Sequence, residues 1–391
     1  MKLRIEKDKL TDVVSRGGMS LKGDPMNDTS YIGYGHISVS AGRLTVLSSG
    51  PSVSSMASID TGDLMAVDGS ATLSVEDMIQ ILRYFPKNEE VLIEKYPSDS
   101  NPNGFVSMKS GKMKLNLRCI NSRMFSQMDE PPPDLRFDMF DGEVVSKSLS
   151  RAASLPSTYD ADGVYNNLAL RRSGDLLYVG GGSDRMIGYL PVCPMDHDFR
   201  PVFIPTALIQ PVVKFIVPGE LHLASTGKKL FVKQNFACVR ICLPDGIETK
   251  SRDYTRLIGK KMEAGFTVSK EKLADIVKGC MAVNKSEAMI RVRDGALSVE
   301  SVSDGDGKNF MSVVEYGSPV PDVVPEYDFA IPPPLIMEFL KKCSSDVRME
   351  FSHARIASND RSPSFMLMKS DEFSTYMQPS PVILGKYGNH G

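Results

Sequence analysis

The side chains most able to do chemistry are scattered along this chain. Its five histidines lie far apart and show no HExxH or similar spacing, so they predict no shared zinc site. Cys238 and Cys242 stand four apart in an apparent strand. This spacing separates them by about 13 Å, too far for one zinc ion with bonds to sulfur of about 2.3 Å. Asp196-His197-Asp198 could bind a metal, but an exposed loop is the simpler interpretation.

Nucleotide and nucleophile motifs are equally weak. The run Gly180-Gly181-Gly182-Ser183 suggests a phosphate loop, but no GxxxxGK[ST] pattern follows, and the run is better interpreted as the end of a strand. The sequence has no GxSxG elbow and no Cys–His pair at a known family spacing. Paired carboxylates such as Glu89-Glu90 stand beside a turn and are interpreted as solvated charge. We therefore expect no catalysis, no metal and no cofactor.

Length and composition indicate a soluble globular protein. The chain has 391 residues, 41% hydrophobic and 24% charged, which suits two or three cores. No apolar run approaches the roughly 18 residues of a membrane helix, and charges stand where a signal peptide would be apolar. Six cysteines do not form a disulfide framework, so we expect a reduced, cytoplasmic setting and no membrane partner.

The overall charge excludes one class of nucleic-acid binder. The chain has 46 basic and 48 acidic residues, a net charge of −2. A generally polybasic protein that neutralises phosphates over its whole surface is excluded. A protein with its positive charge gathered on one face is not.

A long internal period is the strongest pattern in the sequence. A short alternating apolar segment leads into a helix with an apolar stripe three times, and its starts are 132 and 131 residues apart. The segments are 3–5 before a helix at 7–21, 135–137 before 141–155, and 266–268 before 269–283. Hairpins follow with turns at Gly42, Gly174 and Gly295.

A second helix and further strands complete each third. The helical stripes span 75–82, 208–213 and 335–340, with Pro211 expected to delay or kink the middle helix. Strands follow at 112–120, 230–242 and 365–377. The sequence therefore predicts an α+β protein of three similar domains, each with two helices packed on antiparallel sheets. The expected domains are residues 1–132, 133–260 and 261–391.

This organisation resembles a known family. The order of elements, the opening Met1-Lys2-Leu3-Arg4-Ile5 and the segment Arg252-Asp253-Tyr254-Thr255-Arg256-Leu257 resemble the bacterial DNA polymerase III beta subunit, the sliding clamp. The resemblance covers essentially the whole chain and is that of a divergent member, from a bacterium or a phage. It implies the DNA-clamp fold, in which this chain is half of a six-domain ring closed head-to-tail by a homodimer. The ring encircles duplex DNA and tethers the replicative DNA polymerase, without catalysis.

The resemblance also implies that basic helix faces line the DNA channel. Lys9 and Arg16, Lys147 and Arg151, and Lys278 and Lys285 are spaced to share helix faces. The competing interpretation is that amphipathic helices generally expose lysines, and that basic residues near a helix C-terminus offset its dipole. The expected DNA-binding set is Lys9, Arg16, Lys22, Arg83, Lys147, Arg151, Lys214, Lys278, Lys285 and Lys341.

In the family, short linear motifs of the polymerase and the clamp loader bind one pocket between the second and third domains. The stretch that usually reads Thr-Asp-Gly-His-Arg-Leu is Gly181-Gly182-Ser183-Asp184-Arg185-Met186 here, so it matches in part. The tail that completes the pocket is nearest to Met377-Gln378-Pro379-Ser380, and an ordinary domain seam is the alternative. The expected pocket residues are Tyr165, Arg185, Met186, Arg256, Leu257, Met377, Gln378 and Pro379.

Ring closure requires an edge of the first domain to meet an edge of the third. By position, Ile81 and Leu115 would face Ala282 and Val283 of a partner copy, although a head-to-tail contact closes only with the correct rotation. The alternative interpretation is that these four residues belong only to the hydrophobic core. The alternative function is a monomeric β-rich protein-binding scaffold or decoy that never encircles DNA. An enzyme with an unrecognised site is a third possibility that no residue supports.

Overall fold

The computed structural model describes most of the chain, in two compact units. The described residues are 1–19, 34–50, 52–63, 65–121, 128, 130–153, 155, 167–182, 186–250, 253–260, 262, 264–293, 296–302, 309–314, 316–317, 327–352, 366–370, 374–377 and 380–381. One unit comprises Met1–Ser150 and Phe199–Lys250, and the other comprises Arg151–Asp198 and Ser251–Gly391. The middle third is thus divided between the units, and the domain boundaries expected at 132 and 260 stay predictions. Within the described residues, no helix is long and apolar enough to cross a membrane.

The first third consists of two helices and two antiparallel sheets. Strands β1, β6, β7 and β8 form one sheet in that order, and β5, β2, β3 and β4 begin another. The strands are β1 (Lys2–Glu6), β2 (Tyr34–Ser40), β3 (Arg43–Ser49), β4 (Val53–Asp60), β5 (Gly69–Ser74), β6 (Glu90–Tyr96), β7 (Phe105–Ser110) and β8 (Met113–Arg118). The hairpin expected around Gly42 is β2–β3, in which Val39 is opposite Leu44.

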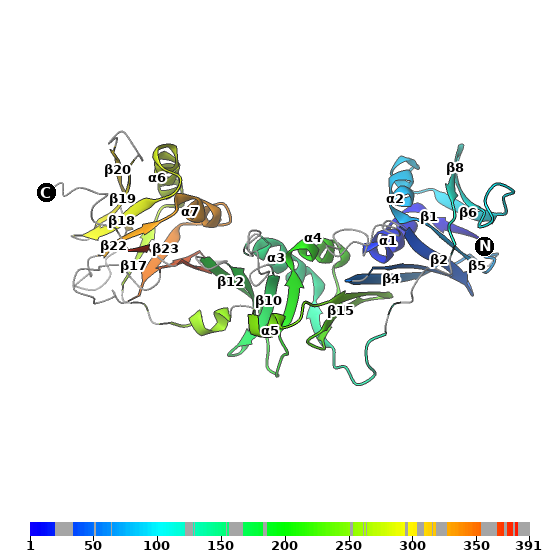
Figure 1. The fold of residues 1–391 in the computed structure, drawn as a ribbon, viewed down its shortest axis with the longest axis horizontal. Helices are drawn as coiled ribbons and strands as arrows, with labels where there is room; N and C mark the ends of the chain where they lie inside the picture. The colour runs from blue at the N-terminus through cyan, green and yellow to red at the C-terminus, as the bar shows by residue number, and fades with distance from the viewer. Residues whose placement is uncertain are drawn as a thin grey trace. The chain divides into compact units, whose positions relative to one another are not determined.

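The two helices of this third cover its sheets. Helix α1 (Lys7–Gly17) buries Leu10, Val13 and Val14, the stripe expected from the sequence, and contacts α2, β3 and β4 (Figure 1). Helix α2 (Val75–Tyr84) begins at Ser74, whose side chain accepts a hydrogen bond from the Asp77 amide, as an N-cap does. Burial of its apolar face fixes α2 against the same core.

The middle third repeats this order. Its elements are β9 (Asp138–Asp141), α3 (Gly142–Ala152), β10 (Asn167–Ser173), β11 (Leu176–Gly182), β12 (Met186–Pro194), β13 (Val202–Pro205), α4 (Thr206–Phe215), β14 (Glu220–Ser225), β15 (Lys229–Gln234) and β16 (Ala237–Cys242). A short helix α5 (Ile247–Lys250) and a 3-10 segment η3 (Tyr254–Leu257) follow. Helix α4 begins at Thr206 and includes Pro211, so the proline does not delay its start.

One expected strand was placed too early. The apolar segment 135–137 is not the strand, because the Leu135 amide bonds to the Pro132 carbonyl in a turn, and β9 begins at Asp138. Phe140 of β9 is buried and lies opposite Leu221 of β14. The alternation of Leu135 and Phe137 mimicked a strand three residues ahead of the real one.

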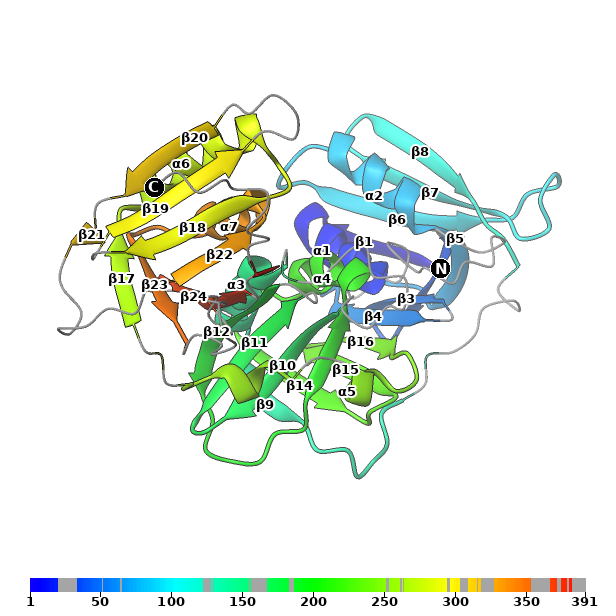
Figure 2. The same cartoon turned by 60° about the vertical axis from the view of Figure 1, so that its left-hand side comes forward.

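The last third has the same order again. Its elements are β17 (Ala264–Val268), α6 (Lys270–Val283), β18 (Ala288–Arg293), β19 (Ala296–Val302), β20 (Asn309–Val314), β21 (Tyr316–Gly317), β22 (Tyr327–Ile331), α7 (Pro333–Leu340), β23 (Val347–Phe351), β24 (Met366–Lys369), β25 (Ser374–Met377) and β26 (Ser380–Pro381). Strands β20, β19, β18, β22 and β26 form one sheet, and Figure 2 shows the first four side by side with α6 and α7 behind them. The described residues thus contain six helices of eight or more residues, two in each third.

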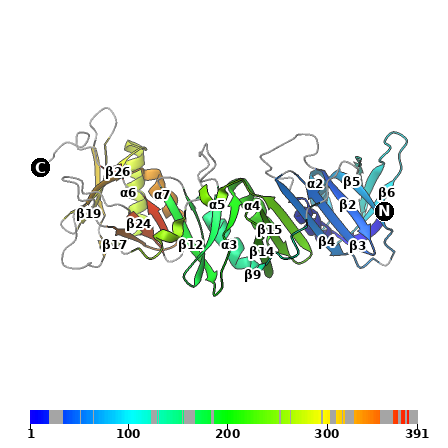
Figure 3. The same ribbon diagram turned by 60° about the horizontal axis from the view of Figure 1, so that its bottom comes forward.

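Two of the sheets cross from one third to the next with the same register. In the first unit β4 pairs with β16, and in the second unit β12 pairs with β25, both antiparallel. Figure 3 shows β2, β3 and β4 side by side in the first of these sheets. Residues 53–56 lie opposite 241–238, and residues 186–189 lie opposite 377–374. Val46 and Val179 occupy equivalent positions in their hairpins. When the hairpins are aligned on these two residues, 53–56 align with 186–189, so their partners 241–238 and 377–374 are equivalent as well. The chain therefore forms the same pairing between strands of two different thirds twice, and each such pairing is called a seam below.

Candidate nucleic-acid and partner-binding surfaces

Most cations of the expected DNA-binding set are exposed on helices or at their ends. Periodic burial of the apolar stripe leaves the opposite face of each helix to charged residues. The exposed members are Lys9, Arg83, Lys147, Arg151, Lys214, Lys278, Lys285 and Lys341. Their exposure makes them available to a phosphate backbone, and it also fits the competing interpretation of solvated helix faces.

Three of these lysines already have acidic neighbours on their own helix or, for Lys9, at the residue directly before that helix. Lys9 Nζ lies 2.9 Å from Glu6, Lys147 Nζ 2.7 Å from Glu143, and Lys278 Nζ 2.9 Å from Asp275. All six side chains are exposed, and such pairs contribute only about 0–1 kcal/mol. The lysines can therefore exchange these carboxylates for other anionic groups at little cost.

Arg16 is a correction to the expected set. It is 7% exposed, its Nη2 donates to the Gln234 carbonyl at 3.0 Å, and its guanidinium lies 4.7 Å from the centre of the Phe215 ring. Burial lowers its pKa from the ordinary arginine value, although Asp12 opposes this effect. Arg16 therefore joins the first third to the middle third instead of facing DNA.

Two residues of the expected partner pocket are buried methionines on paired strands. Met186 of β12 lies directly opposite Met377 of β25, and both are at most 5% exposed. The pairing of β12 with β25 brings them together across nearly 200 residues of sequence, because a strand register fixes which side chains are neighbours. This confirms their expected proximity; their role in binding a partner stays a prediction.

Arg256 and Leu257 belong to η3, which contacts β10 and β12. Arg256 is 85% exposed, with its Nε 3.6 Å from Asp253, and Leu257 is half-buried. The segment therefore presents one exposed cation and one partly apolar side chain beside the sheet that carries Met186 and Met377. This combination suits a peptide with an apolar anchor.

Tyr254 anchors this segment, a role that the sequence did not indicate. Its side chain is fully buried, and its hydroxyl donates to the carbonyls of Ala169 (2.8 Å) and Tyr178 (2.9 Å). The Tyr254 ring stacks on Tyr189 of β12 with centroids 6.1 Å apart. Burial raises the pKa of the Tyr254 hydroxyl, which stays a donor at all physiological pH values.

Gly180 explains why the glycine run is present. A Cβ atom at this position would lie 2.8 Å from the Tyr254 ring and 2.8 Å from the Gly188 carbonyl oxygen. The missing side chain lets the aromatic ring reach the sheet, so this glycine serves packing and not phosphate binding. As expected, the run ends a strand, because β11 stops at Gly182.

Comparison with known proteins now gives the fold a name. No protein-family model and no curated protein sequence matches this chain. Solved structures match across almost all of it. The DNA polymerase III subunit beta of Pseudomonas aeruginosa has 14% identity and a TM-score of 0.78, covering 98% of this chain and 100% of that one. The chain has the sliding-clamp fold.

Two further matches support this assignment. The beta subunit of the Streptococcus pyogenes DNA polymerase has 12% identity and a TM-score of 0.78, covering 98% of this chain and 100% of its own. The DNA polymerase sliding clamp of Bacillus subtilis has 13% identity and a TM-score of 0.77, covering 98% and 99%. The expected α+β clamp fold is confirmed, and the low identity fits a divergent sequence.

The residues expected at the closing contact of a clamp lie beside two sheet ends. Leu115 belongs to β8, the last strand of its sheet, and α2, which carries Ile81, contacts β8. Ala282 and Val283 end α6, which contacts β20, the last strand of another sheet. Ala282 is exposed and the other three are half-buried, so none is committed to the core.

Some expected site residues of the clamp lie outside the described residues: Lys22, Tyr165, Arg185, Gln378 and Pro379. Among the residues that the structure describes, no group of three or more His, Cys, Asp or Glu side chains could hold a metal ion. His197 of the acidic loop lies 3.0 Å from Asp196 through its Nδ1, and both are exposed.

Proposed function

We propose that this protein is a DNA sliding clamp, in which two copies close head-to-tail around duplex DNA and tether a replicative polymerase. The repeated seam carries the proposal. Each seam joins the last strand of one third's hairpin sheet to the closing strand of the next third, β4 to β16 and β12 to β25. Two equivalent strands remain: β20 is the last hairpin-sheet strand of the last third, and β8 is the closing strand of the first third. Both lie at the ends of their sheets. A second copy can pair both, which leaves no such edge open.

The register of this third seam follows from the other two. Ser55 lies opposite Val239 in the first seam, and Gly188 lies opposite Thr375 in the second. Position 310 of β20 is equivalent to Ser55, because Ser301 lies opposite 310 as Ser48 lies opposite Ser55. Leu115 is equivalent to Val239, because each stands two residues after the first residue of its strand, Met113 in β8 and Ala237 in β16. We therefore expect position 310 of one copy to lie opposite Leu115 of the other. Leu115 was already among the expected interface residues.

The exposed helix cations supply weak contacts to DNA in this arrangement. Topological enclosure retains the DNA, so the phosphate contacts need not be strong, and weak contacts permit sliding. A net charge of −2 is compatible with this role, because carboxylates beside Lys9, Lys147 and Lys278 offset part of the positive charge on the helices. The partners implied by the clamp fold are the polymerase and the clamp loader.

The same partners would dock through short linear motifs at the site formed by Met186, Met377, Arg256 and Leu257. Two buried methionines with one exposed cation beside them suit a motif with an apolar anchor and an acidic or carbonyl group. The rigid anchoring of η3 by Tyr254 reduces the ordering cost of binding.

Cysteine cross-linking tests the closing seam directly. A variant with Leu115→Cys and Phe310→Cys should form a covalent dimer under mild oxidation, because the two positions are directly opposite. The control, Leu115→Cys with Val313→Cys, places the cysteines about 10 Å apart along the strand and should cross-link poorly. Equal cross-linking of both pairs, or monomers throughout, would reject the register.

Retention on DNA tests the function itself. A ring that assembles on a nicked circular plasmid and is then cross-linked should stay on that plasmid and slide off once the plasmid is linearised. Equal dissociation from both would favour the monomeric scaffold, which sedimentation at micromolar concentration would show as a single chain.

A further inference from the structure

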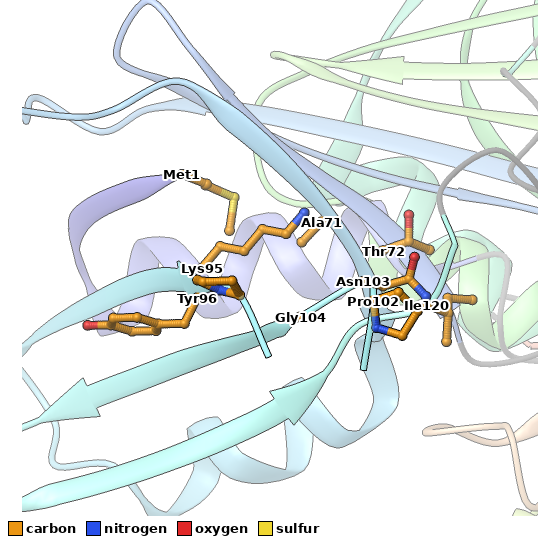
Figure 4. A pocket seen from close by; sticks show the side chains of 10 residues that line it. Met1, Ala71, Thr72, Lys95, Tyr96, Pro102, Asn103, Gly104 and Ile120 are labelled. Atoms are coloured by element: carbon orange, nitrogen blue, oxygen red, sulfur yellow. The ribbon is translucent and has the colours of Figure 1, made fainter. Parts of the chain in front are cut away.

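A half-open cavity lies in the first third, in the compact unit that does not contain Met186 and Met377. Its volume is about 420 Å³, within the range of pockets that bind ligands. The walls come from β5, the end of β6, the loop that follows β6, and Ile120 (Figure 4). All lining residues belong to the first compact unit, so the cavity exists in a single copy of the chain.

The walls are held in place by hydrogen bonds. The Asn101 side chain is buried, and its Nδ2 donates to the carbonyls of Gly104 (2.6 Å) and Cys119 (3.0 Å). The Ile120 amide donates to the Thr72 carbonyl at 2.8 Å. The loop wall and the β5 wall are thus tied to the same short stretch, 119–120. A cavity with fixed walls loses little conformational entropy on binding.

The cavity is positively charged. Lys95 is the one charged side chain among its lining residues, and it is exposed. Lys95 Nζ donates to the Ser70 carbonyl at 2.8 Å, which holds the ammonium at the β5 wall. The adjacent Glu94 belongs to another group, because it pairs with Lys2 at 3.0 Å and accepts a hydrogen bond from the Tyr96 hydroxyl at 2.6 Å.

His36 lies behind this wall and does not cancel the charge. Its Nδ1 is 3.0 Å from the Thr72 hydroxyl, and burial, together with Lys95, lowers its pKa from the ordinary histidine value. A neutral imidazole adds neither positive nor negative charge to the cavity, so Lys95 remains the charged side chain that an anion would meet there. Apart from the α-ammonium group of Met1, the remaining lining is uncharged and in part apolar, with Ala71, Pro97, Pro102 and Ile120.

The repeat relates this cavity to the end of the last third. In the first third, Thr72 forms an antiparallel bridge with Ile120, which stands three residues after Leu117 of β8. In the last third, Ala330 forms the same kind of pair with Ser380, which stands three residues after Met377 of β25. The cavity therefore occupies, in the first third, the position that in the last third adjoins the buried methionines of the proposed partner site.

We propose that this cavity is a second docking site, which takes an extended segment of a partner protein with an acidic side chain placed against Lys95. The proline and isoleucine surfaces pack against apolar neighbours in that segment, and the Lys95 ammonium pairs with its carboxylate. The site goes beyond the ring function, because neither DNA nor a second copy of the chain is needed to form it.

Retention of defined peptide pools on the immobilised full chain tests the site. One pool holds acetylated, amidated hexapeptides with apolar residues and a single Asp or Glu, and the matched pool holds Asn or Gln there. The wild type should retain the acidic pool about threefold more than the amide pool, a difference of about 0.65 kcal/mol, as expected for one exposed ion pair. Lys95→Glu should abolish this preference. Lys87→Glu makes the same charge change at an exposed position outside the cavity and should keep it.

A filling variant separates this cavity from the site at Met377. Asn103→Trp places an indole in the half-buried loop wall and should block the acidic pool, while Met377→Ala should leave its retention unchanged. Circular dichroism confirms that each variant is folded. Equal retention of both pools, an unchanged preference in Lys95→Glu, or binding of inorganic phosphate at Lys95 without either pool would overturn the proposal. Loss through Met377→Ala alone would assign the peptides to the other site and also reject it.

Discussion

At the scale of single residues, the Tyr254 hydroxyl holds η3 through two carbonyl groups. Tyr254→Phe keeps the ring and its stacking but leaves the Ala169 and Tyr178 carbonyls without this donor. We expect a loss of about 1–3 kcal/mol in the free energy of unfolding, measured by urea denaturation. Tyr84→Phe removes a hydroxyl from a side chain that is 75% exposed and should change stability by less than about 0.5 kcal/mol. A Tyr254→Phe protein as stable as the wild type would show that the two bonds contribute nothing.

Glu94 gives a second prediction at this scale, on pH. A hydrogen bond from Tyr96 and one from Lys2 lower the pKa of its carboxyl to about 2. A carboxyl with a depressed folded-state pKa stabilises the fold above its unfolded pKa, and this contribution is lost as the pH falls from about 4.5 to about 2. Glu94→Gln should therefore flatten the decline of stability over that range.

Thermal unfolding at a series of pH values measures this effect. Glu90→Gln is the matched control, since Glu90 is exposed and its carboxyl is 4.0 Å from Arg4. The control should follow the wild-type profile. Identical profiles for Glu94→Gln and the wild type would mean that other carboxylates dominate acid unfolding.

At the scale of elements, the packing of η3 on the sheet depends on Gly180. Gly180→Val would place branched atoms where the Tyr254 ring lies, since even a Cβ comes within 2.8 Å. We expect a loss of about 1–3 kcal/mol and weaker binding of peptides at the methionine site. Ser40→Val, at the exposed end of β2, should be nearly neutral in urea denaturation. Unchanged stability in Gly180→Val would show that η3 can move aside.

Local periodicity explains how far the sequence could predict these elements. The six helices, the hairpins and the closing strands depend on neighbours within one third, and the apolar stripes indicated them. The turn before β9 resembled a strand because Leu135 and Phe137 alternate in the same way. Arg16 and Tyr254 could not be placed, because Phe215, Gln234, Ala169 and Tyr178 are 76 to 218 residues away. A seven-residue spacing put Arg16 on the face of Lys9, but burial by a distant segment decides its environment.

At the scale of the whole molecule, the seams and the helix cations have separable roles. In the proposed ring, salt should weaken encounter with DNA without opening the ring, because the proposed closing seam is a strand pairing and the proposed DNA contacts are ionic. The slope of log K against log salt therefore reports how many phosphates the side chains neutralise. The pairing of the strands does not affect this slope.

Replacing single cations then sorts those that meet DNA from those that do not. On a short linear duplex, the slope of log K against log salt falls by about 0.9 for each phosphate that the protein no longer neutralises, or about 1.8 for a ring with two copies of the side chain. Lys214→Ala, on α4, should show this decrease. Lys228→Ala, in the exposed turn between β14 and β15, should not.

Arg16→Met should leave the slope unchanged and lower the unfolding free energy, since the Arg16 guanidinium bonds to Gln234 and packs on Phe215. A smaller slope for Arg16→Met than for Lys214→Ala would place the DNA on the side of the fold where the first and middle thirds join, and the proposed channel would be wrong.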